Sequence, residues 1–390
     1  MPNCRGGRRV HLVNPIVKCI IQPGEGVAPL IKAINGAKKT IEIVIFRFNR
    51  REIERALAAA VARGVHVHAL IAHTNRGGER GLRELELRLL GVGVTVARTD
   101  DDLVRYHGKL MLVDRRVLYL LAFNFTYLDM ERSRSFGIVT TNKKHVLEAA
   151  RLFEADTKRL PYTPGSATFI VSPLNARKQL ITFIRGAKKE LLIYDPEIAD
   201  PAILRLLQAR SKAGVTVNII GKVTATSTTL PEPRRLRMRL HTRSIIRDGS
   251  WAFVGSQSLR TLELDSRREI GIIFRDPKVV GQIAKTFRED WESGGTPASH
   301  PLSPEEAAEL DSASASKVAR KVAKAVVNGL SPVTPVVENS VREIAGQSSG
   351  VSLNGHKIEE TVKNAVKDAV KQVVRDFVEE AVEAHAEPKP

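Results

Sequence analysis

The stretches HGKLMLVDRRVLYLLAFN, residues 107–124, and HTRSIIRDGSWAFVGSQS, residues 241–258, decide the fold of this chain. Each begins with a histidine and has a cation two positions later and an aspartate seven positions later. The second stretch follows the first at a separation of 134. Gly137 and Gly271 keep the same separation, so no gap falls within either stretch. A constant period between polar positions indicates two copies of one fold unit. We therefore predict that the two copies bring both histidines and both cations to one shared site.

The repeat extends upstream of these stretches with a different period. Residues 35–46 resemble residues 185–196, and residues 62–71 resemble residues 212–221, in both cases at a separation of 150. The first copy therefore carries about sixteen extra residues before its histidine. Within this insert, residues 80–96 have leucines at helical spacing, followed by a run typical of a strand.

Strands and helices alternate along both copies. Apolar runs such as IEIVIF (41–46), VHVHALI (65–71) and KLMLVD (109–114) indicate buried strands, and residues 53–61 carry one apolar helical face. Asp248 and Gly249 form a hairpin signal, and Asp114 holds the same place in the first copy. This alternation predicts an α/β fold.

Changes in composition divide the chain. The segment LPYTPGSA (160–167) is the expected joint between the copies, and a Pro-, Ser- and Gly-rich stretch follows residue 295. The expected parts are an N-terminal segment (1–24), a first repeat (25–160), a second repeat (167–295), a linker (296–356) and an amphipathic helical tail (357–386). The mixed charges of the tail favour packing or self-association over lipid binding.

Charge is the strong compositional signal. The chain has 61 Lys and Arg against 43 Asp and Glu, and the first 300 residues carry a net charge of +21. Such a field attracts polyanions, so nucleic acid and an anionic membrane surface are both candidate partners. The two cysteines exclude a disulfide framework and a zinc-type cysteine pattern.

Targeting signals are weak in this sequence. The basic start has no sustained apolar run, and no apolar window reaches the length of a transmembrane helix. We expect a cytoplasmic or peripheral membrane protein. Secretion stays open, because a start assigned at the wrong residue would hide a leader.

Alternate residues of a strand share a face, which places the charges near each histidine in a row. Arg105, His107 and Lys109 form the first row. The second row consists of Arg235, Arg237, Arg239, His241 and Arg243, with Leu236, Met238 and Leu240 on the opposite, apolar face. Such rows suit a phosphodiester, whose negative charge must be matched throughout the reaction. A solvated strand face is the alternative, and the shared register of the two copies weighs against it.

Two imidazoles in one site can divide the work of phosphodiester cleavage. One adds to phosphorus and the other protonates the leaving alcohol, while the cations neutralise the non-bridging oxygens. This chemistry requires no metal ion and no cofactor. His66, His68 and His73 are interpreted as polar strand residues rather than metal ligands, because Thr216 and Asn218 align with the first two.

These residues resemble the phospholipase D superfamily, whose hallmark H-x-K-x4-D-x6-G-S-x-N occurs twice. The first copy departs from it at Leu121 and Ala122, and the second at Arg243 and Ser258. The family often has a downstream Glu or Asp that orients a histidine; Glu269 fits this place, and Ser135 occupies it in the first copy. The resemblance implies two pseudo-symmetric α/β lobes with mixed sheets, one shared active site and a phosphohistidine intermediate.

The resemblance also assigns roles to individual residues. It implies catalytic roles for His107, Lys109, Asp114, Asn124, His241, Arg243, Asp248, Ser256 and Glu269. The cationic rows make Arg105 and Arg239 expected substrate contacts, and Ser258 at the motif position of Asn is a third. His107 is the expected nucleophile because its copy retains Lys109 and Asn124, and His241 is the expected acid. The reverse assignment stays open.

Three functions are consistent with this sequence. The first is hydrolysis or transfer of phospholipid headgroups by a phospholipase D-like phosphodiesterase. The second is a metal-independent endonuclease of the same superfamily, and the third is a catalytically weakened protein that binds anions.

Overall fold

The computed structural model describes residue 15 and residues 17–73, 79–224 and 230–294. The expected linker (296–356) and helical tail (357–386) lie outside these residues. We call residues 17–158 the first lobe and residues 169–293 the second lobe. Each lobe is built on its own main sheet, which confirms the α/β class.

The main sheet of the first lobe has the strand order β1-β8-β7-β6-β2-β3-β4. Its strands are β1 (Val17–Gln22), β2 (Thr40–Ile45), β3 (His66–Ile71), β4 (Thr95–Arg98), β6 (Leu110–Val113), β7 (Val117–Leu121) and β8 (Ser133–Thr140). The strands from β2 to β4 are parallel and the others antiparallel. The helices are α1 (Ala28–Gly36), α2 (Arg51–Ala62), α3 (Glu79–Gly91), α4 (Tyr127–Glu131) and α5 (Lys143–Lys158).

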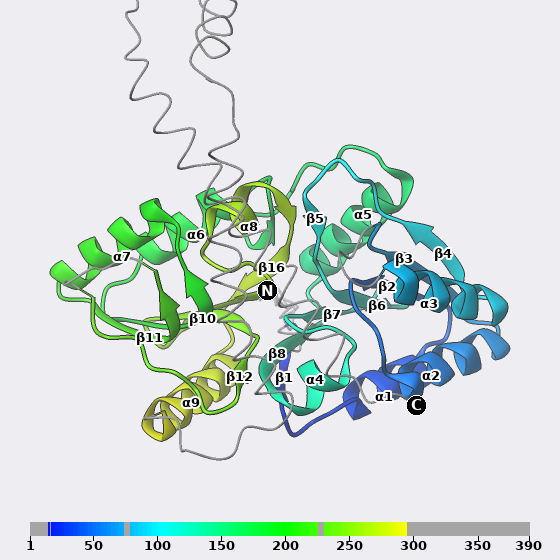
Figure 1. The fold of residues 1–390 in the computed structure, drawn as a ribbon, viewed down its shortest axis with the longest axis horizontal. Coiled ribbons are helices and arrows are strands. Elements are labelled where there is room, and N and C mark those ends of the chain that lie inside the picture. Colours follow the sequence, from blue (N-terminus) through cyan, green and yellow to red (C-terminus); the bar gives the residue numbers. More distant parts are fainter. Residues whose placement is uncertain (1–14, 16, 74–78, 225–229, 295–390) are drawn as a thin grey trace, which may run out of the picture. The chain divides into compact units, whose positions relative to one another are not determined.

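The main sheet of the second lobe has the strand order β11-β10-β13-β14-β16-β9, with β10 and β11 parallel (Figure 1). Its strands are β9 (Phe169–Val171), β10 (Glu190–Ile198), β11 (Thr216–Val223), β13 (Arg243–Arg247), β14 (Trp251–Gly255) and β16 (Ile270–Phe274). Its helices are α6 (Ala176–Arg185), α7 (Pro201–Lys212), α8 (Thr261–Asp265) and α9 (Pro277–Ser293).

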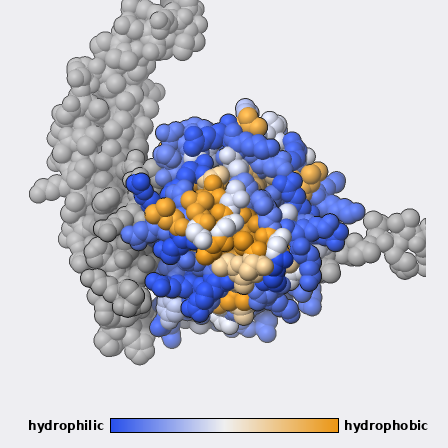
Figure 2. Space-filling model, turned by 90° about the vertical axis from the view of Figure 1, so that its right-hand side faces the viewer, coloured by the Kyte–Doolittle hydropathy of each residue, from blue (hydrophilic) through white to orange (hydrophobic). Residues whose placement is uncertain are grey.

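The insert of the first lobe has the structure that its leucine spacing predicts. It contains α3 and then β4, and Leu82, Leu85 and Leu89 are buried in the core of the lobe. The other face of the insert leaves Leu87 and Leu90 exposed. Figure 2, which faces the right-hand side of Figure 1, shows an apolar area surrounded by hydrophilic residues.

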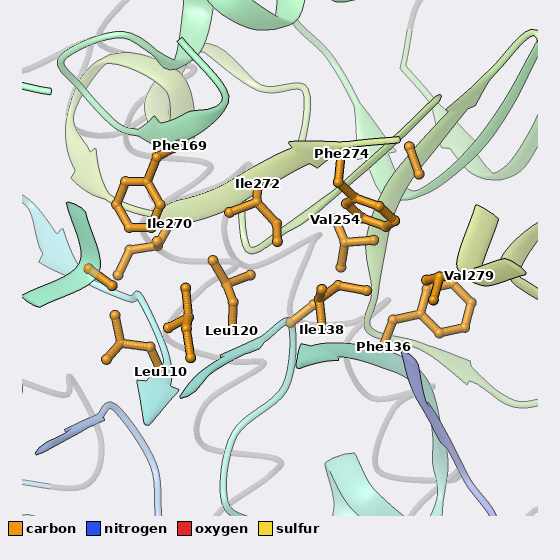
Figure 3. Packing of buried hydrophobic residues seen from close by; sticks show 14 of the residues in the cluster. Leu110, Leu120, Phe136, Ile138, Phe169, Val254, Ile270, Ile272, Phe274 and Val279 are labelled. Carbon is orange, nitrogen blue, oxygen red and sulfur yellow. The ribbon is translucent and has the colours of Figure 1, made fainter. Parts of the chain in front are cut away.

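The two lobes share a hydrophobic core. Along β7, Leu118 and Leu120 point into the shared cluster, whereas Tyr119 and Leu121 pack into the outer core of the first lobe. Opposite faces of one strand are therefore both buried, which explains its continuous apolar sequence. Figure 3 shows Leu110, Leu120, Phe136 and Ile138 of the first lobe facing residues of β9, β14, β16 and α9. Burial of this surface holds the lobes together.

Two short parallel pairings also join the lobes. The strand β5 (Arg105–Tyr106) pairs with β15 (Arg267–Arg268) of the second lobe, and β12 (Arg239–Leu240) pairs with the start of β8 in the first. Both pairings lie just before a motif histidine. The prediction of one strand from residue 235 to 243 is wrong. Only residues 239 and 240 form β12, and Met238 is exposed, because this segment meets the edge of the other lobe for two residues only.

Candidate functional site

The pairing of β5 with β15 places His107 against the second lobe. The backbone N–H groups of His107 and Gly108 both donate to the carbonyl of Arg268, at 2.8 and 3.0 Å. The next residue of the second lobe is Glu269. Its carboxylate Oε2 lies 2.9 Å from Nδ1 of His107, so the two residues form a hydrogen-bonded pair between lobes.

The other ring nitrogen of His107 faces a lysine. Nζ of Lys109 lies 2.9 Å from Nε2 of His107, and both side chains are buried. The ring of Phe46 packs edge-on against the imidazole, with centroids 4.5 Å apart, and also lies 5.3 Å from Nζ of Lys109. Phe46 therefore packs against both His107 and Lys109.

Burial changes the protonation of this first group. It lowers the pKa of His107 well below its usual value, and the positive charges of Lys109 and Arg243 act in the same direction. Burial lowers the pKa of Lys109 to about 7, although Glu269 opposes the change. Burial and the negative charge of Glu263 raise the pKa of Glu269 to about 7. Lys109 and Glu269 thus exchange protons near neutral pH, whereas His107 favours its neutral form there.

His241 has the corresponding backbone position in the second copy. The N–H groups of His241 and Thr242 donate to the carbonyl of Arg134 in the first lobe, at 3.1 and 2.9 Å. Its Nδ1 lies 3.4 Å from Oδ2 of Asp129, an ion-pair distance without hydrogen-bond alignment. The carboxylate of Asp129 also accepts a hydrogen bond from Nη1 of Arg239, at 2.6 Å. Asn124 donates twice to it, from its backbone N at 2.7 Å and from Nδ2 at 2.8 Å.

Asp129 and His241 influence each other through charge. Burial opposes ionisation of Asp129, but the charges of His241 and Arg239 and the Asn124 hydrogen bond outweigh it. The pKa of Asp129 is therefore below its usual range. Burial lowers the pKa of His241 well below its usual value, and Asp129 opposes that change. An ionised carboxylate thus stands beside the second imidazole.

Arg243 occupies the place of the second lysine and is tied down by its own lobe. Its Nε donates to Oγ of Ser258 at 3.0 Å, and its Nη1 donates to the carbonyl of His241 at 2.6 Å. The backbone N of Ser258 donates to Glu263 at 2.5 Å. These hydrogen bonds hold the guanidinium of Arg243 next to the backbone carbonyl of His241.

The two halves form one charge cluster. The charges of Lys109 and Arg243 both lower the pKa of His107 and that of His241, although each cation belongs to only one lobe. Both imidazoles are mostly buried, with 8% and 6% of their residue surfaces exposed. The two imidazoles thus lie within the influence of the same two cations, and such a set can carry out phosphoryl chemistry.

Asp114 and Asp248 lie away from this cluster. Asp114 follows β6 whereas His107 precedes it, and Asp248 and His241 lie at opposite ends of β13. Each aspartate has a positive φ, 52° and 53°, and accepts hydrogen bonds from three consecutive backbone N–H groups, of residues 38–40 or 188–190. The expectation that they act in the site is therefore corrected, because their carboxylates hold turns.

The remaining predicted residues lie around the cluster. Oγ of Ser256 accepts a hydrogen bond, at 3.1 Å, from the backbone N of Ile270, the residue that follows Glu269. The guanidinium of Arg105 lies 5.5 Å from the ring of Phe46, and its charge acts on His107. Arg239 contacts Asp129 rather than open solvent.

Three residues of the site escaped the sequence reasoning. Asp129 and Glu263 have the same separation as the two motif histidines, so the repeat itself contained the signal that would have found them. Phe46 aligns with Pro196 at the separation of 150, and no such signal marks it.

The structure describes residue 15 and residues 17–73, 79–224 and 230–294. Within these ranges, no group of three or more His, Cys, Asp and Glu gathers as a metal-ion site. None of the helices within them combines the length and the apolar character needed to cross a bilayer.

Known proteins resemble this chain in sequence. The family model described as "Cardiolipin synthase, PLD-like domain" matches residues 30–157 and 180–291. The mitochondrial cardiolipin hydrolase of Canis lupus familiaris is 27% identical over 158 residues, which are 39% of this chain and 58% of that protein. The protein of the same name from Homo sapiens is 27% identical over 157 residues, with the same shares. The match thus spans little more than half the length of these curated relatives.

Solved structures resemble it in fold. The polyphosphate kinase from Porphyromonas gingivalis matches with a TM-score of 0.59 at 20% identity, over 71% of this chain and 50% of that one. The phosphatidylserine synthase of Haemophilus influenzae Rd KW20 matches with a TM-score of 0.54 at 12% identity, over 73% and 87%. At these identities the likeness shows a common two-lobed fold.

Proposed function

The chain belongs to the phospholipase D-like family described by the cardiolipin synthase model, and from this premise we propose that it cleaves phospholipid headgroups through a phosphohistidine intermediate. The reaction is headgroup hydrolysis when water completes it and phosphatidyl transfer when another alcohol does. The observation that carries this proposal is the charge cluster, in which Lys109 and Arg243 act on both His107 and His241.

The environments of the two imidazoles support different roles. Glu269, whose pKa is raised to about 7, accompanies His107, and Lys109 is near enough to donate a hydrogen bond to Nε2 of the same ring. Both features favour a neutral ring with its lone pair on Nε2, as a nucleophile requires. At His241, the negative charge of Asp129 opposes the lowering of the pKa by burial and so favours retention of the proton that a general acid gives up. We therefore assign His107 as nucleophile and His241 as acid.

Nε2 of His107 attacks phosphorus, the bond from phosphorus to the headgroup oxygen breaks, and His241 gives its proton to that oxygen. Water or an alcohol then attacks phosphorus, the bond from phosphorus to nitrogen breaks, and the neutral His241 takes the incoming proton. Lys109 and Arg243 neutralise the non-bridging oxygens throughout.

Two observations support a phospholipid as substrate. The curated relatives in which 58% of the length is matched are named as cardiolipin hydrolases, and cardiolipin is a phosphodiester. The net charge of the first 300 residues, +21, favours approach to an anionic lipid surface.

Substrate class is tested by product analysis. The full chain is incubated in excess chelator with mixed micelles containing cardiolipin and phosphatidylglycerol, and separately with single- and double-stranded DNA. We expect released or exchanged headgroup from the lipid and intact DNA. Cut strands with untouched lipid would replace this proposal with the endonuclease alternative. Inactivity on both, with retained binding, would favour the anion-binding alternative.

The roles of the histidines are tested with a substrate whose leaving group needs no proton. In H241A, phosphatidyl-p-nitrophenol should give a burst of about one nitrophenolate per site, because the covalent intermediate forms but hydrolyses slowly. H107A should give no burst. H66A, which changes an exposed histidine outside the site, serves as the matched control. A burst in H107A and none in H241A would reverse the assignment.

A further inference from the structure

We propose that Asp129 of the first lobe is the positioning residue of His241, and that it replaces the carboxylate missing at position 135. The proposal deepens the proposed function and rests on it. It concerns the orientation of the His241 ring. The repeat provides no acidic residue for this ring, because position 135 is a serine.

The repeat shows which residue should have faced His241. His107 is bonded through its backbone to Arg268, and the following residue, Glu269, reaches its ring. His241 is bonded through its backbone to Arg134, so the following residue, Ser135, holds the equivalent position. A serine side chain is shorter than that of glutamate and carries no charge. Its buried Oγ has no hydrogen-bond partner among the residues that the structure describes.

Asp129 supplies a carboxylate from a different element. Thr126 caps α4 by accepting a hydrogen bond from the backbone N of Asp129, at 3.3 Å, which fixes where this side chain begins. Asn124 and Arg239 donate to its two oxygens and hold the carboxylate in place. Its Oδ2 then lies 3.4 Å from Nδ1 of His241, a buried nitrogen with no hydrogen-bond partner among the described residues.

The equivalent residue in the second lobe behaves differently. Glu263 is the counterpart of Asp129 in the repeat and accepts from the backbone N of Ser258, as Asp129 accepts from that of Asn124. Its other partners are Arg260 and Arg267, and among the described residues no hydrogen bond or ion pair joins it to a histidine. In the second lobe, Glu263 binds the backbone N of Ser258 and Glu269 binds a histidine ring. In the first lobe, Asp129 makes both kinds of contact.

This geometry has a direct chemical consequence. A carboxylate beside Nδ1 favours the ring form with hydrogen on Nδ1, which directs Nε2 toward the reacting phosphate group. Catalytic hydrogen bonds commonly shorten when a substrate binds, so a separation of 3.4 Å is compatible with this role.

The first test reads the ring directly and needs no turnover. The full chain is labelled with ¹⁵N-histidine, and the His241 resonances are identified by their loss in H241Q. We expect a protonated Nδ1 in the wild-type protein and a shift toward the other ring form in D129N. A wild-type His241 protonated on Nε2 alone would overturn the proposal, even if D129N fails to fold. Because this result is independent of activity, an inactive protein would refute the proposed function without deciding this inference.

The second test is kinetic and uses rescue. D129N should lower kcat by about 10²- to 10⁴-fold with a small change in KM, because the acid loses its orientation. Adding S135E to D129N restores a carboxylate at the place that Glu269 holds in the other copy, and should recover at least about tenfold of the loss. The matched control is E263Q, which removes the equivalent backbone-holding carboxylate and should leave the ¹⁵N spectrum of His241 unchanged. A folded D129N with wild-type kcat would overturn the proposal.

Discussion

Glu269 of the second lobe lies 2.9 Å from the ring of His107 in the first lobe, through Oε2 and Nδ1. The two residues are 162 positions apart in the chain. The parallel pairing of β5 with β15 brings them together, since it sets Arg105 opposite Arg267 and so brings the next residues into register. Among the described residues, each of His107 and His241 therefore has its carboxylate partner in the other lobe.

Replacing Glu269 by Gln should impair the nucleophile. The amide keeps the shape of the side chain but does not stabilise the imidazolium character that develops during attack. We expect kcat to fall by about 10²- to 10⁴-fold, measured by headgroup release from micelles. The control E42Q removes a buried carboxylate that binds Arg115 outside the site, and should keep wild-type kcat. Equal losses in both variants would mean that the effect is structural.

Anion binding should weaken as pH rises through neutrality. The pKa of Lys109 is lowered to about 7, so this cation is charged below that pH and largely neutral above it. The affinity for tungstate, whose charge is constant in this range, should fall by up to about tenfold per pH unit above pH 7. Calorimetric titration measures the affinity. In K109R the cation stays charged and the decline should be markedly shallower, with Glu269 contributing the remainder. A K109R profile as steep as that of the wild type would exclude Lys109 as the titrating group.

Gly108 should tolerate no larger residue without a loss of stability. A Cβ at this position would lie 2.4 Å from Cδ1 of Ile270, a buried residue of the other lobe. We expect G108A to lower the free energy of unfolding by about 1–3 kcal/mol, measured by denaturant titration. G36A is the control, because nothing lies within 4 Å of its added Cβ. In the background I270A, the cost of G108A should largely disappear; a full cost there would place the strain elsewhere.

Asp114 should contribute to stability rather than to turnover. Burial opposes its ionisation, but hydrogen bonds from the backbone of Thr40, Lys39 and Lys38 outweigh this effect and lower its pKa. The ionised form is therefore favoured by folding, and its contribution is present above the ordinary carboxyl pKa and lost as pH falls. D114N, whose side chain tolerates the positive φ, should lose about 1–3 kcal/mol at neutral pH. The difference from wild type should shrink in acid. A large fall in kcat with unchanged stability would return Asp114 to the active site.

Much of the fold could be predicted from the repeat. The constant separation between the two motifs identified two equivalent units, and the apolar runs identified buried strands because both faces of a strand such as β7 are covered. The helical spacing of Leu82, Leu85 and Leu89 predicted α3 correctly. The row from Arg235 to Arg243 was over-extended, because alternation of charge cannot tell a strand from a segment that meets a sheet edge for two residues.

The candidate site was predicted less completely. Arg239 was expected to meet substrate but bonds Asp129, a residue of the other lobe. Asp114 has the place of the family motif, yet the fold uses its carboxylate to hold the start of β2. Residue type and spacing indicate which groups are available, whereas their partners depend on contacts between distant segments.

The amino-acid order by itself determined that the chain is double, that each half offers one imidazole and one cation, and that strands alternate with helices. Local periodicity and a constant separation record these properties directly. Only the tertiary structure decided that His107 pairs with Glu269 and that Asp129 approaches His241. Those pairings follow from the register of two short strands across a shared apolar core, and such a register depends on packing between the lobes rather than on neighbours in the chain.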